Sequence, residues 1–156
     1  MNNHTRIDRV TRFINTLNQA RELGLTPQEA GEGYLVLALP YSEKIIGNPD
    51  TGAIHGGAIT TLMDTASGSV MICALDHFEL CPTLDLRVDY MHPAEPGKTV
   101  YARAETYKVT PNIIFTRCEA YQEKGVTIAN CVGTFMRIGI NATPKSYRDL
   151  ITGGAE

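Results

Sequence analysis

A loop followed by a helical pattern carries the groups best suited to chemistry. It contains Asn48, the tripeptide His55-Gly56-Gly57 and, seven residues after the second glycine, the carboxylate of Asp64. The N-terminus of a helix has unpaired N–H groups and a partial positive charge, and glycine lets a ligand approach that backbone closely. These glycines therefore suit a carbonyl oxygen that becomes an oxyanion, while the carboxylate would drive a hydrolysis. A tight turn that requires glycine is the alternative explanation.

Asp64 lies away from the face of its helix that is expected to pack. At about 100° per residue, five apolar residues form a stripe about 100° wide, namely Ile59, Leu62, Met63, Ala66 and Val70. Asp64 lies about 140° from the centre of that stripe, on the side of Thr61 and Gly68. A solvated carboxylate is one interpretation. The other is a catalytic carboxylate near a second subunit, because a fully exposed helix face usually carries more Lys and Glu.

His55 has two candidate roles, as a base or as a residue that orients the loop by hydrogen bonding, and we favour orientation. Gly57 and Asp64 are about 10.5 Å apart along one helix, so one carbonyl cannot easily touch both. If two such helices lay antiparallel across a twofold axis, the glycine of one would face the acid of the other. The spacing therefore predicts a site shared between two subunits.

The elements that hold this helix follow from hydrophobic periodicity. A leading helix is expected over 5–23, a strand over 32–40, a loop over 41–55 and the main helix over 56–76. Four strand patterns follow without an intervening helix, over 83–92, 99–109, 112–122 and 126–138. This order predicts an α+β fold in which the main helix covers one face of a five-stranded antiparallel sheet. The polar tail 141–156 is expected to be partly mobile.

Two details of the strands are also predicted. Alternation over 83–92 puts Leu84, Leu86, Val88 and Tyr90 on one face and Thr83, Asp85, Arg87 and Asp89 on the other. In the last strand, Gly133 is interpreted as the mark of a bulge.

Composition and charge exclude several partner classes. The chain has 156 residues, enough for one domain over 1–156, and a formal net charge of -3. It has no basic stripe and no apolar run near the roughly 20 residues of a membrane span, so neither nucleic acid nor membrane is expected as a partner. The N-terminal residues MNNHTRIDRV lack the apolar core of a signal peptide.

The four cysteines do not form a metal-binding pattern. None belongs to a CxxC pair, so a zinc site is not expected. Cys118 and Cys131 lie inside strand patterns, and we interpret them as small buried hydrophobes rather than nucleophiles. A reduced, cytoplasmic protein is therefore expected.

The combination of these segments resembles a known family. The loop from Asn48, the stretch GAIHGGAITTLMDTASG and the strand TLDLRVDYMHPA, followed by a strand meander, resemble hotdog-fold acyl-CoA thioesterases of the phenylacetate-degradation (PaaI-like) type. The resemblance covers about residues 30–139. It implies a hotdog fold, an antiparallel sheet wrapped around a central long helix, here with an extra N-terminal helix.

The resemblance also implies roles for individual residues. The backbone N–H of Gly57 would polarise the thioester carbonyl, and Asn48 of the preceding loop would help to hold the carbonyl or a water. His55 would correspond to the family's histidine beside it. Asp64 would act as the nucleophile or as the general base for water, and Thr83 would orient the water or the acid. The family's sites lie between subunits, so a homodimer at least, and a homotetramer built as a dimer of dimers, is implied.

The substrate is implied to be an acyl-CoA, and neither a metal nor a redox cofactor is implied. Gly56, Met63 and Tyr90 are expected to contact the substrate, and Met71 and Phe78 are further candidates for the acyl pocket, although each large apolar residue is also a candidate for the core.

Two other functions compete with hydrolysis of the thioester. One is a hotdog hydratase or dehydratase, which would set an acid against a β-hydroxyacyl chain. The other is a domain that binds acyl-CoA without catalysis. The position of the acid after His55-Gly56-Gly57 favours the hydrolase over the hydratase, and the presence of Asn48, a glycine-led helix and Asp64 together argues against a silent domain.

Overall fold

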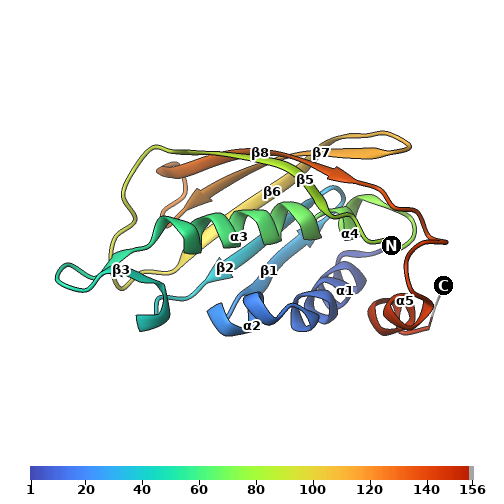
Figure 1. Cartoon of the computed structure of the whole chain (residues 1–156), viewed down its shortest axis with the longest axis horizontal. Coiled ribbons are helices and arrows are strands. Elements are labelled where there is room, and N and C mark those ends of the chain that lie inside the picture. The colour runs from blue at the N-terminus through green and yellow to red at the C-terminus, as the bar shows by residue number, and fades with distance from the viewer. Residues whose placement is uncertain (155–156) are drawn as a thin grey trace.

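A six-stranded antiparallel sheet wraps around one long helix in the computed structural model, which describes residues 1–154 (Figure 1). The helix is α3 (Gly56–Ser69), and it packs on the sheet through buried residues that include Ile59, Leu62, Met63 and Ala66. These residues belong to the stripe expected from the sequence. The predicted α+β architecture, with a central helix on one face of an antiparallel sheet, is confirmed.

The strands of this sheet lie, in spatial order, as β1 (Thr26–Gly31), β2 (Tyr34–Leu39), β6 (Val100–Val109), β7 (Ile113–Tyr121), β8 (Thr127–Met136) and β5 (Thr83–Tyr90). The last four in the sequence match the four expected strands. β1 was not expected, so the sheet has six strands instead of five. Its sequence TPQEAG is polar and contains Pro27. Proline has no N–H to donate, and an edge strand tolerates it because the backbone groups on the outer side of the strand pair with no neighbouring strand.

A β-bulge near the start of β5 changes the face on which Thr83 lies. Thr83 pairs with Phe135 and Asp85 pairs with Thr134, so Leu84 is an extra residue between the two pairs. In a regular strand, residues two apart share a face, and Thr83 would point the same way as Asp85. The bulge instead puts Thr83 opposite the buried Phe135. The expected alternation is therefore wrong at Thr83.

Gly133 is not the bulge that the sequence suggested. It pairs regularly with Leu86 on β5 and with Thr116 on β7. A Cβ atom at this position would lie 3.0 Å from side-chain atoms of both Leu86 and Phe135. The glycine is required by close packing on the side of α3 and not by backbone geometry.

The segment before α3 is more ordered than the expected loop. It contains the 3-10 helix η1 (Glu43–Ile45) and a small hairpin of β3 (Ile46–Asn48) and β4 (Ala53–Ile54). The main helix itself is divided at Val70, and its last turn is the separate helix α4 (Met71–Ala74).

The N-terminal helix is present but broken. α1 (Asn3–Thr16) and α2 (Asn18–Leu23) are separated at Leu17, whose backbone is extended. Gly24 ends α2 in the left-handed conformation, with φ of 70°. The helix predicted over 5–23 is thus confirmed in position and corrected in continuity.

Part of the polar tail forms a helix that was not predicted from the sequence. α5 (Lys145–Thr152) places Tyr147 and Ile151 on one face, and Ile151 is fully buried. Tyr147 packs against Phe13 of α1 and against Phe78. Residues four apart lie on the same face of a helix, so this short apolar pair was the available signal.

The four cysteines are free and buried, as expected for Cys118 and Cys131, which pair across β7 and β8. Among the helices described, none has the length and apolar character needed to cross a membrane.

Candidate active site

The N-terminus of α3 is capped by a histidine side chain. The Gly57 N–H donates to Nδ1 of His55 at 2.9 Å, and the Ala58 N–H donates to the His55 carbonyl at 3.0 Å. A Cβ atom on Gly57 would lie 2.8 Å from that ring nitrogen, so glycine is required for the ring to lie over the helix start. Because Nδ1 accepts a hydrogen bond, it carries no proton here. This geometry corresponds to the orienting role favoured for His55.

Gly56 provides the free backbone donor at this end of the helix. Within residues 1–154, no hydrogen bond from the Gly56 N–H is found, whereas its carbonyl accepts the Tyr90 hydroxyl at 2.7 Å. The same hydroxyl also bonds Thr60 on the next turn. A hollow of about 330 Å³ lies here, lined by Ile54, Gly56, Ile59, Tyr90, Met91, His92, Pro93 and Ala94. Gly56 and Tyr90, both expected at the substrate, therefore lie together.

Asn48 lies at the same end of α3, in the hairpin next to His55 (Figure 1). Its Oδ1 accepts the Asp50 N–H at 3.0 Å, and its carbonyl accepts the Gly52 N–H at 2.8 Å. The side chain thus closes the turn between β3 and β4, and it leaves its amide N–H groups to other partners.

Asp64 and Thr83 form the second group, in the middle of the helix. The Thr83 hydroxyl donates to Oδ1 of Asp64 at 3.0 Å, and the carboxylate is half-buried. No group of the described chain donates to Oδ2, which stays available to a water or a substrate. The bulge at Leu84 makes the pair, because without it Thr83 would point to the other face of the sheet.

An apolar cavity of about 330 Å³ opens beside this pair. Its walls are Phe13, Leu17, Asp64, Thr65, Gly68, Met71, Ile72, Phe78, Glu79, Leu80, Cys81, Pro82, Thr83, Phe135 and Ile138. Burial raises the pKa of the Cys81 thiol to about 12, so this sulfur is a poor nucleophile at neutral pH. A carboxylate and a hydroxyl at an otherwise apolar cavity are typical of a small-molecule site.

The two methionines considered for this pocket differ in position. Met71 lines the cavity, whereas Met63 is fully buried in the core and lines neither hollow. Met63 belongs to the stripe that packs on the sheet, and its expected substrate contact is therefore corrected. Phe78 lines the cavity, and Tyr90 lines the hollow at the other end.

A buried ion pair next to the cavity was missed from the sequence. Glu79 is 1% exposed, and its carboxylate accepts Nε of Arg137 and the Gly139 N–H, both at 2.6 Å. Met136 N–H donates to the Pro82 carbonyl at 2.9 Å. These bonds hold the segment 79–82 against the end of β8, directly before Thr83. A lone Glu in a turn gives no sequence signal for such a partner.

The two groups lie too far apart to act together in one chain. Gly56 and Asp64 are eight residues apart on one helix, which is about 12 Å. One thioester carbonyl cannot reach the Gly56 N–H and the Asp64 carboxylate of the same chain.

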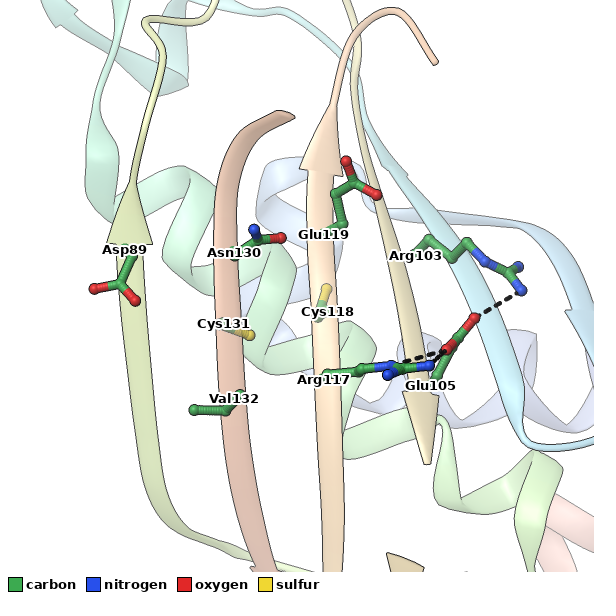
Figure 2. Close-up of a pocket in the computed structure, with 9 residues that line it drawn as sticks. All are labelled: Asp89, Arg103, Glu105, Arg117, Cys118, Glu119, Asn130, Cys131 and Val132. Atoms are coloured by element: carbon green, nitrogen blue, oxygen red, sulfur yellow. Dashed lines mark hydrogen bonds and ion pairs between the residues drawn. The ribbon is translucent and has the colours of Figure 1, made fainter. Parts of the chain in front are cut away.

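A larger hollow of about 400 Å³ lies on the opposite face of the sheet, away from α3 (Figure 2). In it Glu105 is flanked by Arg103 at 3.0 Å and Arg117 at 2.9 Å. The hydrogen bond from Arg117 is the main reason that the pKa of Glu105 is lowered. Glu105 is thus already paired with two guanidinium groups, and no residue predicted for the site lies there. We therefore place the site at α3.

Comparison with known proteins identifies the family of this chain. Residues 51–129, which include α3 and β5, match the model of the thioesterase superfamily. Over 75 residues the chain is 39% identical to a Halobacterium salinarum protein named as an esterase, and this match covers 46% of this chain and 50% of that protein. It is 27% identical over 137 residues to the medium/long-chain acyl-CoA thioesterase YigI of Salmonella typhimurium, covering 80% of this chain and 88% of YigI.

Two solved structures extend the comparison to the fold. A Pseudomonas aeruginosa protein is 58% identical, with a TM-score of 0.79 over 85% of this chain and 99% of that one. The PaaI protein of the Escherichia coli phenylacetic acid degradation operon is 20% identical, with a TM-score of 0.77 over 88% of this chain and 96% of PaaI. The latter likeness concerns the fold alone. The chain therefore has the hotdog fold and belongs to the thioesterase superfamily.

Proposed function

We propose that this protein hydrolyses an acyl-CoA thioester to a free acid and CoA, with Asp64 as the catalytic carboxylate. The observation that carries the proposal is the hydrogen bond from Thr83 to Asp64 at the edge of an apolar cavity. Membership of the thioesterase superfamily supports the reaction, and the similarity to YigI supports a CoA thioester as the substrate.

The contacts of Asp64 support a role for one of its two oxygens in the reaction. Thr83 holds Oδ1, so Oδ2 is the atom that takes a proton from water or attacks the carbonyl carbon itself. As a general base, Asp64 takes a proton from the water that attacks the thioester carbonyl; the carbon–sulfur bond breaks, the sulfur takes up a proton as CoA leaves, and the acyl group ends as a carboxylic acid. As a nucleophile, Asp64 forms an anhydride with the acyl group while the protonated thiol of CoA leaves, and a water then cleaves that anhydride to the free acid and regenerates the carboxylate. Both routes pass through an oxyanion that needs a donor.

We assign that donor to the Gly56 N–H and not to the Gly57 N–H that the resemblance suggested. The Gly57 N–H already donates to His55 at 2.9 Å, whereas the Gly56 N–H has no partner among the described residues. His55 then acts by fixing the first turn of α3. Asn48 likewise acts by fixing the backbone, here in the turn between β3 and β4.

The two groups come together when two copies of the chain associate. β5 is an edge of the sheet, and Leu84 and Tyr90 on it are more than half exposed, at 54% and 53%. An edge strand with unpaired backbone groups is a surface for pairing with a second copy about a twofold axis. We place the Gly56 N–H of one copy against Asp64 of the other, in a homodimer that pairs again into a tetramer. All four cysteines are free, which fits action in the reducing cytoplasm.

A panel of acyl-CoA substrates tests the reaction. Release of free thiol identifies hydrolysis, loss or gain of water without thiol release identifies a hydratase or dehydratase, and saturable binding without a product identifies a silent domain. Asp64→Asn should lower kcat by about 10² or more. Asp76→Asn, at an exposed site after α4, is the matched control and should keep wild-type turnover. Wild-type turnover in Asp64→Asn would remove the carboxylate from the mechanism.

Mixing two inactive variants tests the shared site. Gly56→Val blocks the donor, Asp64→Asn removes the acid, and exchanged heterodimers should regain one intact site of two. Activity should then rise toward about half the wild-type value per heterodimer. Exchange shown by mass without any return of activity would reject the cross-subunit arrangement, and so would a fully active monomer in sedimentation.

A further inference from the structure

We propose that α1, braced from behind by α5, walls the cavity beside Asp64 and sets the size of acyl group that the enzyme accepts. This inference rests on the proposed function and adds the substrate class, an uncharged apolar acyl group of medium length. The family match covers 51–129, so α1 precedes it and α5 follows it. The size limit would therefore come from parts of the chain outside the matched segment.

α1 supplies part of the cavity wall directly. Phe13 and Leu17 line the same cavity as Asp64, and both are half-buried. Leu17 lies where the helix breaks, with φ of -88° and ψ of 110°, and its N–H bonds the Ile14 carbonyl at 3.0 Å. Because α1 ends here, the side chain of Leu17, and not a further turn of the helix, lines this part of the cavity.

α5 holds that wall in place. Tyr147 stacks on Phe78 with ring centroids 6.0 Å apart, and meets Phe13 edge-on at 6.4 Å. Phe13 and Phe78 are themselves 5.9 Å apart, and the Tyr147 hydroxyl bonds Thr16 of α1. Contacts of this kind add to the stabilisation that burial provides. The wall formed by Phe13 and Phe78 is therefore braced from behind and does not yield easily to a longer chain.

The size and charge of the cavity define what fits. The cavity has a volume of about 330 Å³. A group the size of a water molecule takes about 30 Å³, so the cavity holds on the order of ten such groups, which is the size of a medium-length acyl chain. Both oxygens of Glu79 already bind Arg137 and the Gly139 N–H, so this carboxylate offers nothing to a polar substrate. Apart from the reacting end at Asp64 and Thr83, the cavity suits an uncharged apolar chain.

Substitutions of Leu17 test the size limit by changing the wall and not the chemistry. The probes are butyryl-, hexanoyl-, octanoyl-, decanoyl-, dodecanoyl- and hexadecanoyl-CoA, and the measured quantity is kcat/KM for each. Leu17→Ala should raise the ratio of dodecanoyl to octanoyl turnover by about 10-fold or more, and Leu17→Phe should lower it by a similar factor. Leu23→Ala is the matched control, because Leu23 is a partly buried leucine that packs on the core but does not line the cavity.

The outcomes separate this inference from the proposed function. If the wild type hydrolyses acyl-CoA but the length profile is the same in both Leu17 variants, α1 does not set the size and the inference is wrong. If the wild type hydrolyses none of the probes, the proposed function fails, and binding of the free fatty acids by calorimetry then decides the inference. A length preference in binding that shifts with Leu17 supports it, and no binding or no shift rejects it.

A variant that unfolds does not end the test. Circular dichroism and the melting temperature identify such a variant, and Leu17→Met, which keeps most of the volume, then replaces it. Leu17→Met should fold and show a smaller shift in the ratio of dodecanoyl to octanoyl turnover. If a folded Leu17→Met variant changes neither the chain-length profile nor the binding of free fatty acids, the inference is also rejected.

Discussion

Removing the Thr83 hydroxyl should slow catalysis without harming the fold. Thr83→Val keeps the shape of the side chain and deletes the one hydrogen bond that Oδ1 of Asp64 accepts. Hydrogen bonds to a charged group contribute about 1.5–3 kcal/mol, and the lower end applies because Thr83 is exposed in the single chain. A loss of about 1.5 kcal/mol in the transition state corresponds to about a tenfold lower kcat.

Steady-state thiol release with a saturating acyl-CoA measures this effect, and two further variants make it specific. Thr83→Ser keeps the hydroxyl and should restore most of the turnover. Thr134→Val removes a hydroxyl from a neighbouring position on β8 that pairs with Asp85, and it should leave kcat unchanged. A Thr83→Val enzyme with wild-type kcat, or a Thr83→Ser enzyme as slow as Thr83→Val, would refute the orienting role.

Three more predictions concern the elements around the site. Gly57→Ala should push the His55 ring off the helix start and cost about 1 kcal/mol of stability, and His55→Ala should cost the same. Because both variants remove the same hydrogen bond, thermal unfolding of the double variant should show a loss smaller than the sum of the two. Glu79→Ala removes the buried carboxylate from Arg137, which keeps only its bond to the Thr110 carbonyl among the described residues, and should cost about 3 kcal/mol in urea unfolding. Glu123→Ala, at an exposed pair, should cost less than about 1 kcal/mol. Because the pKa of Glu105 is lowered on folding, the folded state binds fewer protons than the unfolded state as this carboxyl titrates. The stabilisation that ionised Glu105 gives to the folded state is therefore present above the ordinary pKa of 4.5 and is lost as the pH falls through the folded pKa. Melting temperatures of wild type and Glu105→Gln should therefore converge as the pH is lowered below the ordinary value of 4.5, and a gap that stayed constant would contradict this.

The helix that carries the site could be predicted because its pattern is local. The stripe through Leu62 and Met63 has the helical period, so the wheel correctly put Asp64 off the packed face. The glycines marked the helix start, and the four strands after it alternate clearly. The helical wheel could not show whether Gly56 or Gly57 keeps a free N–H, because that depends on the rotamer of His55.

The missed features depend on partners far away in the sequence. Thr83 was assigned to the wrong face because a bulge at Leu84 is defined by its pairing with β8 and not by its own residues. β1 is a polar segment that forms a strand only because β2 offers it an edge. α5 has only Tyr147 and Ile151 to bury, a signal too short to identify against a polar background.

If the proposed dimer and the proposed role of Asp64 hold, the bulge at Leu84 links assembly to reactivity through one stretch of backbone. It lies on the edge strand that we propose as the dimer contact, directly beside the hydroxyl that holds Asp64. An edge strand that loses its neighbour can slip in register, and a slip of one residue turns every side chain to the other face. Dilution would then do more than separate the two halves of the site, because each released chain could also turn Thr83 away from its carboxylate. Specific activity should fall with dilution more steeply than the dimer population, and it should recover with a lag while the strand regains its register.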